Sequence, residues 1–320
     1  MPTLSNLDKE SWKYSNINAA LKKLEVTPRD CFWHMPSAFA FLQDDNHIVI
    51  PKNRKVDHPL EISLVAHAGS QISAPLHIHL ESGAEATIIE HQSGEDAYWK
   101  NTNLVITLAE NVQLRHYRIS DDGPASVVTD HLSVVLSHDA RYHMVAVNGA
   151  AGFARSDIHV KLMGKGAACD LSGLTLLDGK RHSDTTLCVD HIAPHCQSSQ
   201  FFKNALKGQS RGVYQGKIHV HKDAQKTDGY QLSNNLLLSP LAEMDVKPEL
   251  EIYADDVKCS HGTTTGQLDE TPLFYLMSRG IDPDSARRLL LEAFLSDVLD
   301  KIPDETVRAT FDKRVATWLE

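Results

Sequence analysis

The sequence lacks the paired cysteines that build disulfide frameworks and zinc knuckles. Its 320 residues contain five scattered cysteines and no CxxC pair, so neither kind of cross-link is indicated. It also lacks runs of Lys or Arg, and its formal net charge is −10. Such a charge argues against a surface that follows phosphates, so we expect no nucleic acid among the partners.

Long apolar runs are missing as well. No stretch approaches eighteen apolar residues, and Met1 to Glu10 is polar rather than a basic-then-apolar leader. These features predict a soluble, cytoplasmic protein without a membrane partner. Hydrophobic residues make up 42% of the chain, which is enough to form a packed core.

The common catalytic motifs are absent too. "GVYQGKI" (212–218) contains a Gly-Lys pair without the spacing of a phosphate-binding loop, and no GxGxxG follows a strand pattern. No GxSxG or HExxH appears. An ATPase activity within this chain alone is therefore disfavoured.

What the sequence does contain is a repeat. "HLESGAEATIIEH" (79–91), "TLAENVQLRHYRI" (107–119), "VLSHDARYHMVAV" (135–147) and "KLMGKGAACDLSG" (161–173) share one pattern. Its apolar markers are Leu80, Leu108, Leu136 and Leu162, followed four places on by Ala84, Val112, Ala140 and Gly166. The series continues less regularly through Val189/Ala193, Val220/Ala224 and Tyr253/Val257, at spacings of 28, 28, 26, 27, 31 and 33.

The segments between the markers alternate apolar and polar residues, as "LVITL" and "IHVHK" illustrate. That alternation is typical of strands. Short strands at a steady interval without helical patterns between them predict a β-solenoid, in which each rung buries a face that it cannot bury alone. A β-sandwich is the alternative, but the recurring turn residue favours the solenoid.

Helical patterns flank the repeats. After residue 268 we expect one helix from the cap Asp269 to Gly280, a second after Asp282 and Pro283, and a third over about 304–319. "NLDKESWKYSNINAALKKL" (6–24) is helix-like, and "CFWHMPSAFAFL" (31–42) is a loop with aromatic anchors. We therefore divide the chain into a mixed N-terminal segment (1–60), a solenoid core (61–268) and a C-terminal helical domain (269–320).

Several histidine and cysteine clusters are candidates for metal binding. "VDHIAPHC" (189–196) offers Asp190, His191, His195 and Cys196, although its proline and its flanking strand patterns favour a rung corner. "LHIHL" (76–80) and "IHVHK" (218–222) each place two histidines on one strand face, which is most simply the polar outside of a rung. Cys169, Cys188 and Cys196 are expected to be buried as small apolar residues.

Cys259 and His261 form a different kind of pair. They lie on one face of a strand, with Cβ atoms about 7 Å apart by strand geometry. Thiolate and imidazole suit zinc or iron, but such sites need about four ligands. Three interpretations stay open: an inert strand end, a metal site completed by another chain, and a catalytic pair in which His261 lowers the thiol pKa.

At these residues the sequence resembles a known family. "LEIYADDVKCSHGTTTGQLDETPLFYLMSRGI" (250–281) is similar to the C-terminal signature of the SufB/SufD family of iron–sulfur cluster assembly proteins, and most similar to its SufD branch. "TDGYQLSNNLLLSPLAEMDVKPELEI" (227–252) and the shorter "ESWKYSN" (10–16) also resemble this family. Two features depart from it: the N-terminal part is shorter than in many SufD proteins, and Gly262-Thr263-Thr264 replaces Gly-Ala-Thr.

The resemblance implies a right-handed parallel β-helix with a C-terminal helical domain. It also implies a non-catalytic scaffold that pairs with a SufB-like paralogue and with the SufC ATPase, and that forms a homodimer when isolated. A nascent iron–sulfur cluster would be shared transiently at the SufB–SufD interface, and reduced flavin is a further candidate cofactor of the complex.

The resemblance also assigns roles to particular residues. His261 matches the histidine implicated in cluster formation, as an iron ligand or proton donor, and Cys259 matches the neighbouring interface cysteine, as a ligand or persulfide-handling thiol. The helices over about 271–299 would dock SufC, with Phe274, Tyr275 and Arg279 as contacts.

Two other functions stay open. A stand-alone β-helix enzyme acting on polysaccharide would need carboxylates clustered in one groove, whereas Asp255 and Asp256 are adjacent and should face opposite ways. A SufB-like paralogue could instead carry a cluster in a homodimer, although the SufD-type "CSHG" stretch (259–262) argues against this reading.

Overall fold

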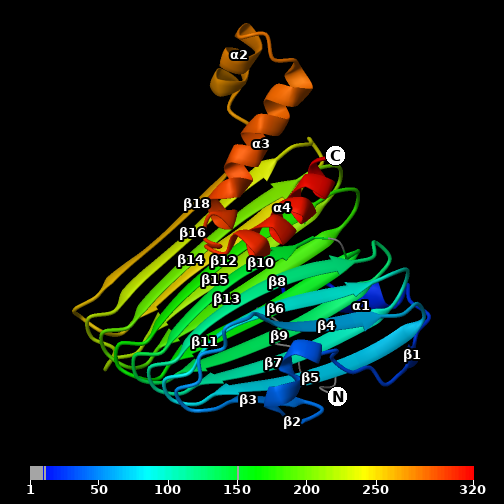
Figure 1. Cartoon of the computed structure of the whole chain (residues 1–320). Helices are drawn as coiled ribbons and strands as arrows, with labels where there is room; N and C mark the ends of the chain where they lie inside the picture. The colour runs from blue at the N-terminus through cyan, green and yellow to red at the C-terminus, as the bar shows by residue number, and fades with distance from the viewer. Residues whose placement is uncertain (1–9, 11, 150) are drawn as a thin grey trace.

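The chain folds into a parallel β-solenoid. The structure, a computed structural model, describes residues 10, 12–149 and 151–320. A ten-stranded sheet and an eight-stranded sheet face each other, and the chain passes from one to the other at every half turn, for about eight turns. The stacked strands and the helices on one face are visible in Figure 1. The mainly β solenoid with C-terminal helices is therefore confirmed.

From β3 onward the strands alternate between the two sheets in chain order. The ten-stranded sheet contains β1 (Thr27–Pro28), β2 (Leu42–Asp44), β3 (His47–Ile50), β5 (Ser70–Leu80), β7 (Trp99–Leu108), β9 (Val127–Leu136), β11 (Phe153–Leu162), β13 (His182–His191), β15 (Arg211–Val220) and β17 (Glu243–Ile252). The eight-stranded sheet contains β4 (Leu60–Ala66), β6 (Glu85–Gly94), β8 (Gln113–Asp122), β10 (Arg141–Asn148), β12 (Ala168–Leu177), β14 (Gln197–Leu206), β16 (Asp228–Leu237) and β18 (Lys258–Gly266).

The four clear repeat markers are confirmed by the strand register. Leu80, Leu108, Leu136 and Leu162 pair in turn across β5, β7, β9 and β11, and all four side chains are fully buried. Of the three later markers, Val220 is confirmed, whereas Val189 and Tyr253 were wrong by two residues and by one. The register continues to His191 rather than Val189, and, after Val220, to Ile252 rather than Tyr253.

The fourth repeat contains an extra corner residue, which makes the small residue predicted there wrong by one position. Gly166 takes the left-handed corner conformation, with φ 75°, that Asn111 and Asp139 hold in the preceding rungs. Ala167, not Gly166, is the buried equivalent of Ala140. A fixed offset from the marker cannot detect such an insertion, because the corners vary in length while the strands keep their register.

The C-terminal helices form where their capping residues predict. They are α2 (Glu270–Ser278), α3 (Pro283–Leu299) and α4 (Glu305–Leu319), and the side chains of Asp269, Asp282 and Asp304 accept hydrogen bonds from their first turns. α3 and α4 cover the outer face of the eight-stranded sheet, where residues such as Leu295 and Phe311 pack on outward strand residues. α2 buries none of its residues and projects beyond the solenoid (Figure 1).

The N-terminal segment is less helical than its sequence suggests. Within 6–24 the only described helix is α1 (Ile17–Leu21), and residues 6–9 and 11 of this prediction lie outside the described residues. The 31–42 loop contains a short 3₁₀ helix, η2 (Pro36–Phe41). Trp33 is buried and anchors the loop, as expected. Phe32 and Phe39 are exposed, so these two aromatic residues are not the anchors that the sequence predicted.

The "ESWKYSN" motif has a structural role. Its Trp12 ring lies 4.2 Å from the Arg155 guanidinium on the outer face of the ten-stranded sheet. Ser15 hydrogen-bonds to His182, at 2.9 Å, and to Asp184. The motif therefore fastens the N-terminal segment to the solenoid; Ser11 lies outside the described residues.

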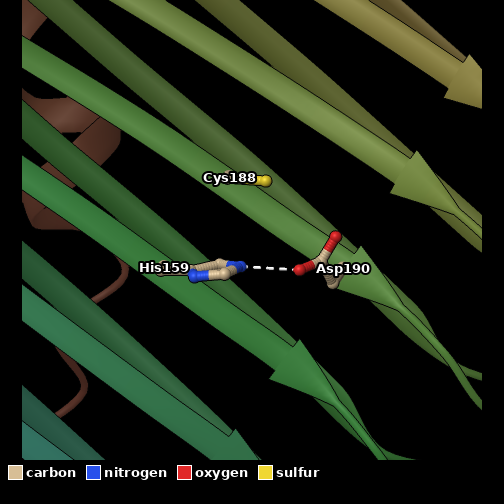
Figure 2. A group of neighbouring side chains, drawn as sticks. All are labelled: His159, Cys188 and Asp190. Atoms are coloured by element: carbon tan, nitrogen blue, oxygen red, sulfur yellow. Dashed lines mark hydrogen bonds and ion pairs between the residues drawn. The ribbon is translucent and has the colours of Figure 1, made fainter. Parts of the chain in front are cut away.

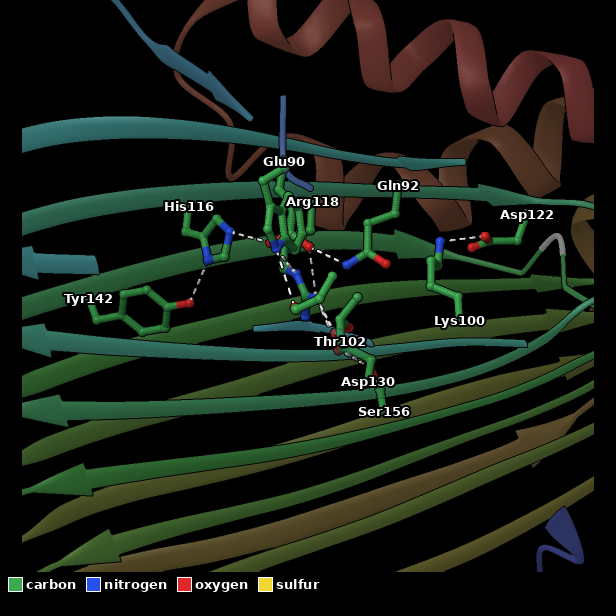
Figure 3. A network of polar contacts seen from close by, with 12 residues as sticks. Glu90, Gln92, Lys100, Thr102, His116, Arg118, Asp122, Asp130, Tyr142 and Ser156 are labelled. Atoms are coloured by element: carbon green, nitrogen blue, oxygen red, sulfur yellow. Dashed lines mark hydrogen bonds and ion pairs between the residues drawn. The ribbon is translucent and has the colours of Figure 1, made fainter. Parts of the chain in front are cut away.

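A charged network is buried between the two sheets (Figure 3). Arg118 contacts Glu90 through Nε, at 2.9 Å, and Asp130 through Nη2, at 2.9 Å, so that one guanidinium joins carboxylates of both sheets. His116 bonds to Glu90 and to the Tyr142 hydroxyl, each at 2.9 Å. Because all five side chains are almost inaccessible to solvent, each charge depends on its partner.

Candidate functional site

The C-terminal end of the solenoid is open. β18 is the last strand of its sheet and bonds to β16 on one side; β17 is the last strand of the other sheet and bonds to β15. In the described part of the chain no strand pairs with the outer edge of either. Unpaired edges of this kind are templates for strand addition by another chain. Apolar side chains are also exposed here, including Tyr253, with 63% of its surface accessible.

Cys259 lies on β18 and faces the solenoid interior. It is half-buried against the cluster of Ile218, Val220, Ala224 and Ala254. Burial raises the pKa of its thiol, the backbone of Gly229 lowers it in part, and the Asp228 carboxylate raises it. The net rise is opposite to the low pKa that a Cys–His nucleophile requires, so the free chain presents a thiol here rather than a thiolate.

His261 lies two residues further along β18, on the face that carries Cys259. It pairs in register with Gln231, which pairs in turn with Gln200 on β14. Both glutamines are buried, while His261 is exposed because no further rung covers it. Polar atoms of Gln200 and Gln231 have no hydrogen-bond partner within the described residues, so His261 ends a polar row that reaches into the solenoid.

Cys259 and His261 do not form a metal site by themselves. Across residues 10, 12–149 and 151–320, the groups of three metal-ligating side chains with ligand atoms within 4.8 Å of one another include neither residue. A site with about four ligands would need further groups from outside this set. The position of the pair on an open strand edge leaves room for a second chain to supply them.

The three predicted docking residues lie on or directly after α2. Phe274 and Tyr275 expose 73% and 56% of their surface. The Arg279 guanidinium lies 5.3 Å from the Tyr275 ring. A projecting helix with two exposed aromatic side chains and an adjacent cation has the composition of an interface hot spot.

The "VDHIAPHC" segment is a rung corner, as the proline suggested. His191 points inward and bonds to Ser198 at 2.8 Å. His195 occupies the left-handed corner position with φ 62°, and the thiol of Cys196 is buried and donates to the Gly164 carbonyl at 3.3 Å. Asp190 instead faces outward and does not join them.

Asp190 belongs to a cluster that was not expected from the sequence. His159 of β11 and His219 of β15 each bond to its carboxylate, at 2.6 and 2.7 Å. Cys188 lies beside them, half-buried on the outer face, which corrects the expectation that this cysteine is buried like Cys169. His159 precedes Asp190 by 31 residues and His219 follows it by 29. The repeat interval was the one sequence signal that could have predicted that these three residues are neighbours.

The remaining candidates are ordinary outer-face groups. His77 stacks on His47, with ring centroids 4.7 Å apart. Asp255 and Asp256 are exposed at a corner, where Asp256 pairs with Lys226.

α3, the longest helix, has 17 residues, and no helix of the described residues combines the length and apolar character of a membrane span.

Comparison with known proteins identifies relatives of the whole chain. A family model described as "SUF system FeS cluster assembly, SufBD core domain" matches residues 64–294. The chain is 32% identical to the iron–sulfur cluster assembly protein SufD of Escherichia coli, over all of this chain and 77% of that protein. It is 32% identical to a SufBD family protein of Synechocystis and 31% identical to the chloroplastic protein ABCI7 of Arabidopsis thaliana, over 82% and 87% of this chain and 61% of each relative.

Proposed function

The chain belongs to the SufBD family of iron–sulfur cluster assembly proteins, and we propose that it is the SufD-type scaffold subunit of an assembly complex. In this proposal it pairs with a SufB-like paralogue and a SufC-like ATPase and performs no turnover itself. The observation that carries the proposal is the open solenoid end, where His261 and Cys259 lie on an unpaired edge strand. The nascent cluster is the cargo of this site.

The edge of β18 accounts for how the paralogue binds. A second solenoid that ends in an unpaired strand can continue the sheet, satisfying the exposed backbone groups of both chains. The exposed Tyr253 and Ile252 would become buried in the same contact. Such pairing brings side chains of the second chain next to His261. These side chains would supply the metal ligands that Cys259 and His261 lack.

His261 and Cys259 take different roles in this proposal. His261 is exposed at the joint, and its imidazole can bind iron or donate a proton to bridging sulfide. Cys259 is half-buried behind it with a raised pKa. Iron would have to displace the proton of this thiol, so Cys259 becomes a ligand only once the complex has formed. As a persulfide carrier it would attack the outer sulfur of a donor persulfide and release the donor's thiol.

Capture of partners tests the scaffold. The tagged chain, purified from its own cell extract, is expected to retain an ABC-type ATPase and a SufB-like protein identified by mass spectrometry. Replacing Phe274 and Tyr275 of α2 by alanine should weaken ATPase capture by about 100-fold or more, because hot-spot aromatic residues each contribute about 2 kcal/mol or more and every interval of about 1.4 kcal/mol is tenfold. Phe39→Ala, at an equally exposed phenylalanine (78%) of the N-terminal segment, is the matched control. A clean monomer or homodimer would contradict the proposal.

His261→Ala tests the assembly site itself. We expect the variant to capture both partners normally, because its side chain is exposed and packs in no core. Iron and sulfide in the anaerobically reconstituted complex should fall about 10–100-fold, as expected for removal of a group that holds or orients a metal. His79→Ala, on the ten-stranded sheet, is the control. If His261→Ala abolished partner capture, His261 would be structural and the cluster site would lie elsewhere.

A further inference from the structure

The outer face of the ten-stranded sheet carries a cluster of metal-ligating side chains on three neighbouring strands. β11 contributes His159, β13 contributes Cys188 and Asp190, and β15 contributes His219, with His221 one residue beyond the strand. Figure 2 shows the imidazole of His159 and the carboxylate of Asp190 facing each other, with the Cys188 sulfur beside them. The proposed assembly site, by contrast, lies on the other sheet.

The strand register brings these groups together. His159 pairs with Cys188, and Asp190 lies two residues further on, on the same face. The ligand atoms of His159, Cys188 and Asp190 all lie within 4.8 Å of one another. The carboxylate is held from both sides, with Oδ2 bonded to His159 Nε2 and Oδ1 to His219 Nδ1. Because the side chain of Asp190 is only 13% exposed, its orientation is fixed before any ion arrives.

We propose that His159, Cys188 and Asp190 bind one divalent cation of the zinc class, and that His219 orients the carboxylate. Imidazole nitrogen, thiolate sulfur and carboxylate oxygen form a ligand set that suits Zn²⁺ and Co²⁺, and that disfavours Mg²⁺ and Ca²⁺, which prefer oxygen alone. Three protein ligands leave a fourth position for water. The contact of His219 with the carboxylate is the outer-shell hydrogen bond that such sites characteristically contain.

The required movement is small. Ligand atoms of a tetrahedral zinc site are about 3.4 Å apart. His159 Nε2 and Asp190 Oδ2 are now 2.6 Å apart, so the ion replaces their hydrogen bond and separates them by under about 1 Å. In the metal-free chain burial raises the pKa of Cys188 to about 12, and Asp190 also raises it. The ion must therefore displace the thiol proton, as metals do when they bind cysteine.

A second triad shares the same carboxylate. The ligand atoms of Asp190, His219 and His221 also lie within 4.8 Å of one another. This set has no sulfur, and it includes His221, whose nitrogen is 3.9 Å from the carboxylate and whose side chain is 43% exposed. The sulfur-containing triad is the more enclosed of the two, with His159 34% exposed. The proposal therefore places the ion there, and the role of Cys188 separates the two arrangements.

Cobalt titration of the purified full-length chain tests this site. We expect one equivalent of Co²⁺ to bind, with a sulfur-to-cobalt charge-transfer band and the strong visible bands of tetrahedral cobalt, and Zn²⁺ to displace it. Cys188→Ser should remove the charge-transfer band and weaken binding at least about 100-fold. His219→Ala should weaken it about 10–100-fold while keeping the band, as expected for loss of an outer-shell contact. Circular dichroism confirms that each variant is folded.

Three control variants make the outcome decisive. His131→Ala, at an exposed histidine of the same sheet, should leave binding unchanged. If His221→Ala removes binding and Cys188→Ser does not, the ion occupies the second triad and the proposal is wrong. If Cys259→Ser removes the charge-transfer band, the metal is at the solenoid end, which also overturns it. The proposal is also wrong if the unaltered chain shows no sulfur-to-cobalt charge-transfer band. None of these results depends on cluster assembly, so the proposed function and this site fail separately.

Discussion

Arg118→Met is expected to destabilise the fold by about 3–5 kcal/mol, the usual cost of removing one partner of a buried ion pair. The Arg118 side chain is 7% exposed and contacts the carboxylates of Glu90 and Asp130, which are 1% and 6% exposed. Methionine fills much of the same volume, so the loss would come from charge and hydrogen bonding. A urea titration followed by circular dichroism measures it.

A matched arginine on the surface provides the control. Arg308 on α4 also contacts two carboxylates, Asp300 and Asp312, each at 2.8 Å. Those carboxylates are 63% and 49% exposed, and water replaces such contacts at little cost. Arg308→Met should therefore change stability by less than about 1 kcal/mol. Equal losses in the two variants would mean that burial is not the cause.

The pH dependence identifies the cause of the Arg118 effect. Burial alone would raise the pKa of Glu90 and Asp130, but Arg118 holds both below their ordinary values of 4.5 and 3.8. In the unaltered chain these carboxylates stabilise the fold above those values, and the contribution is lost as pH falls below them. Without Arg118, burial dominates and both pKa values rise, so the variant gains stability as acid protonates them. The deficit should shrink between pH 7 and about pH 4.5, whereas a packing defect would leave it constant.

The solenoid and its caps could be predicted because their signals are local. Leu80, Leu108, Leu136 and Leu162 recur at nearly constant spacing and all point inward, and Asp282 followed by Pro283 marks the start of α3. The marker Val189 was wrong because the corner after His191 is one residue longer than in the first three repeats, so that Cys196 follows the true marker by five positions instead of four. Of the helix expected over 6–24, the described residues contain only α1 (Ile17–Leu21), because contacts such as Trp12 on Arg155 hold the described residues before it against the solenoid.

Side-chain clusters could be noticed from the sequence only where their members lie close together along the chain. Cys259 and His261 stood out by their spacing on one strand and the resemblance gave them roles, which stay predictions; the structure adds that their strand is an unpaired edge. His159, Asp190 and His219 lie on three consecutive rungs, so a motif within one rung cannot contain them. Once the register is known, however, residues about 29 apart on one face become neighbours, and a search at that interval would find the cluster.

Gly164→Ala is expected to cost more than about 3 kcal/mol, at or above the usual range for overpacking. A Cβ atom at this position would lie 2.0 Å from the backbone nitrogen of His138 and 2.2 Å from the carbonyl carbon of Ser137. These are backbone atoms of the preceding rung, to which Met163 and Gly164 are hydrogen-bonded at Leu136. A side chain could rotate away from the new methyl group, but a stacked rung cannot move without opening the corner.

The effect should extend beyond the corner, because each rung of a solenoid is stabilised mainly by its neighbours. The carbonyl oxygen of Gly164 also accepts a hydrogen bond from the Cys196 thiol of the next rung, at 3.3 Å, so opening this corner loosens the stack on both sides.

Gly266→Ala, on β18 with no atom within 4 Å of the added carbon, should stay within about 0.5 kcal/mol of the unaltered chain. Thermal unfolding compares the two variants. If Gly164→Ala unfolds first in the rungs from β11 onward, it should also lose partner capture, since those rungs carry β18 and the strands β12 and β14 on which α3 packs. A Gly164→Ala variant as stable as Gly266→Ala would show that the corner can open without disturbing the stack.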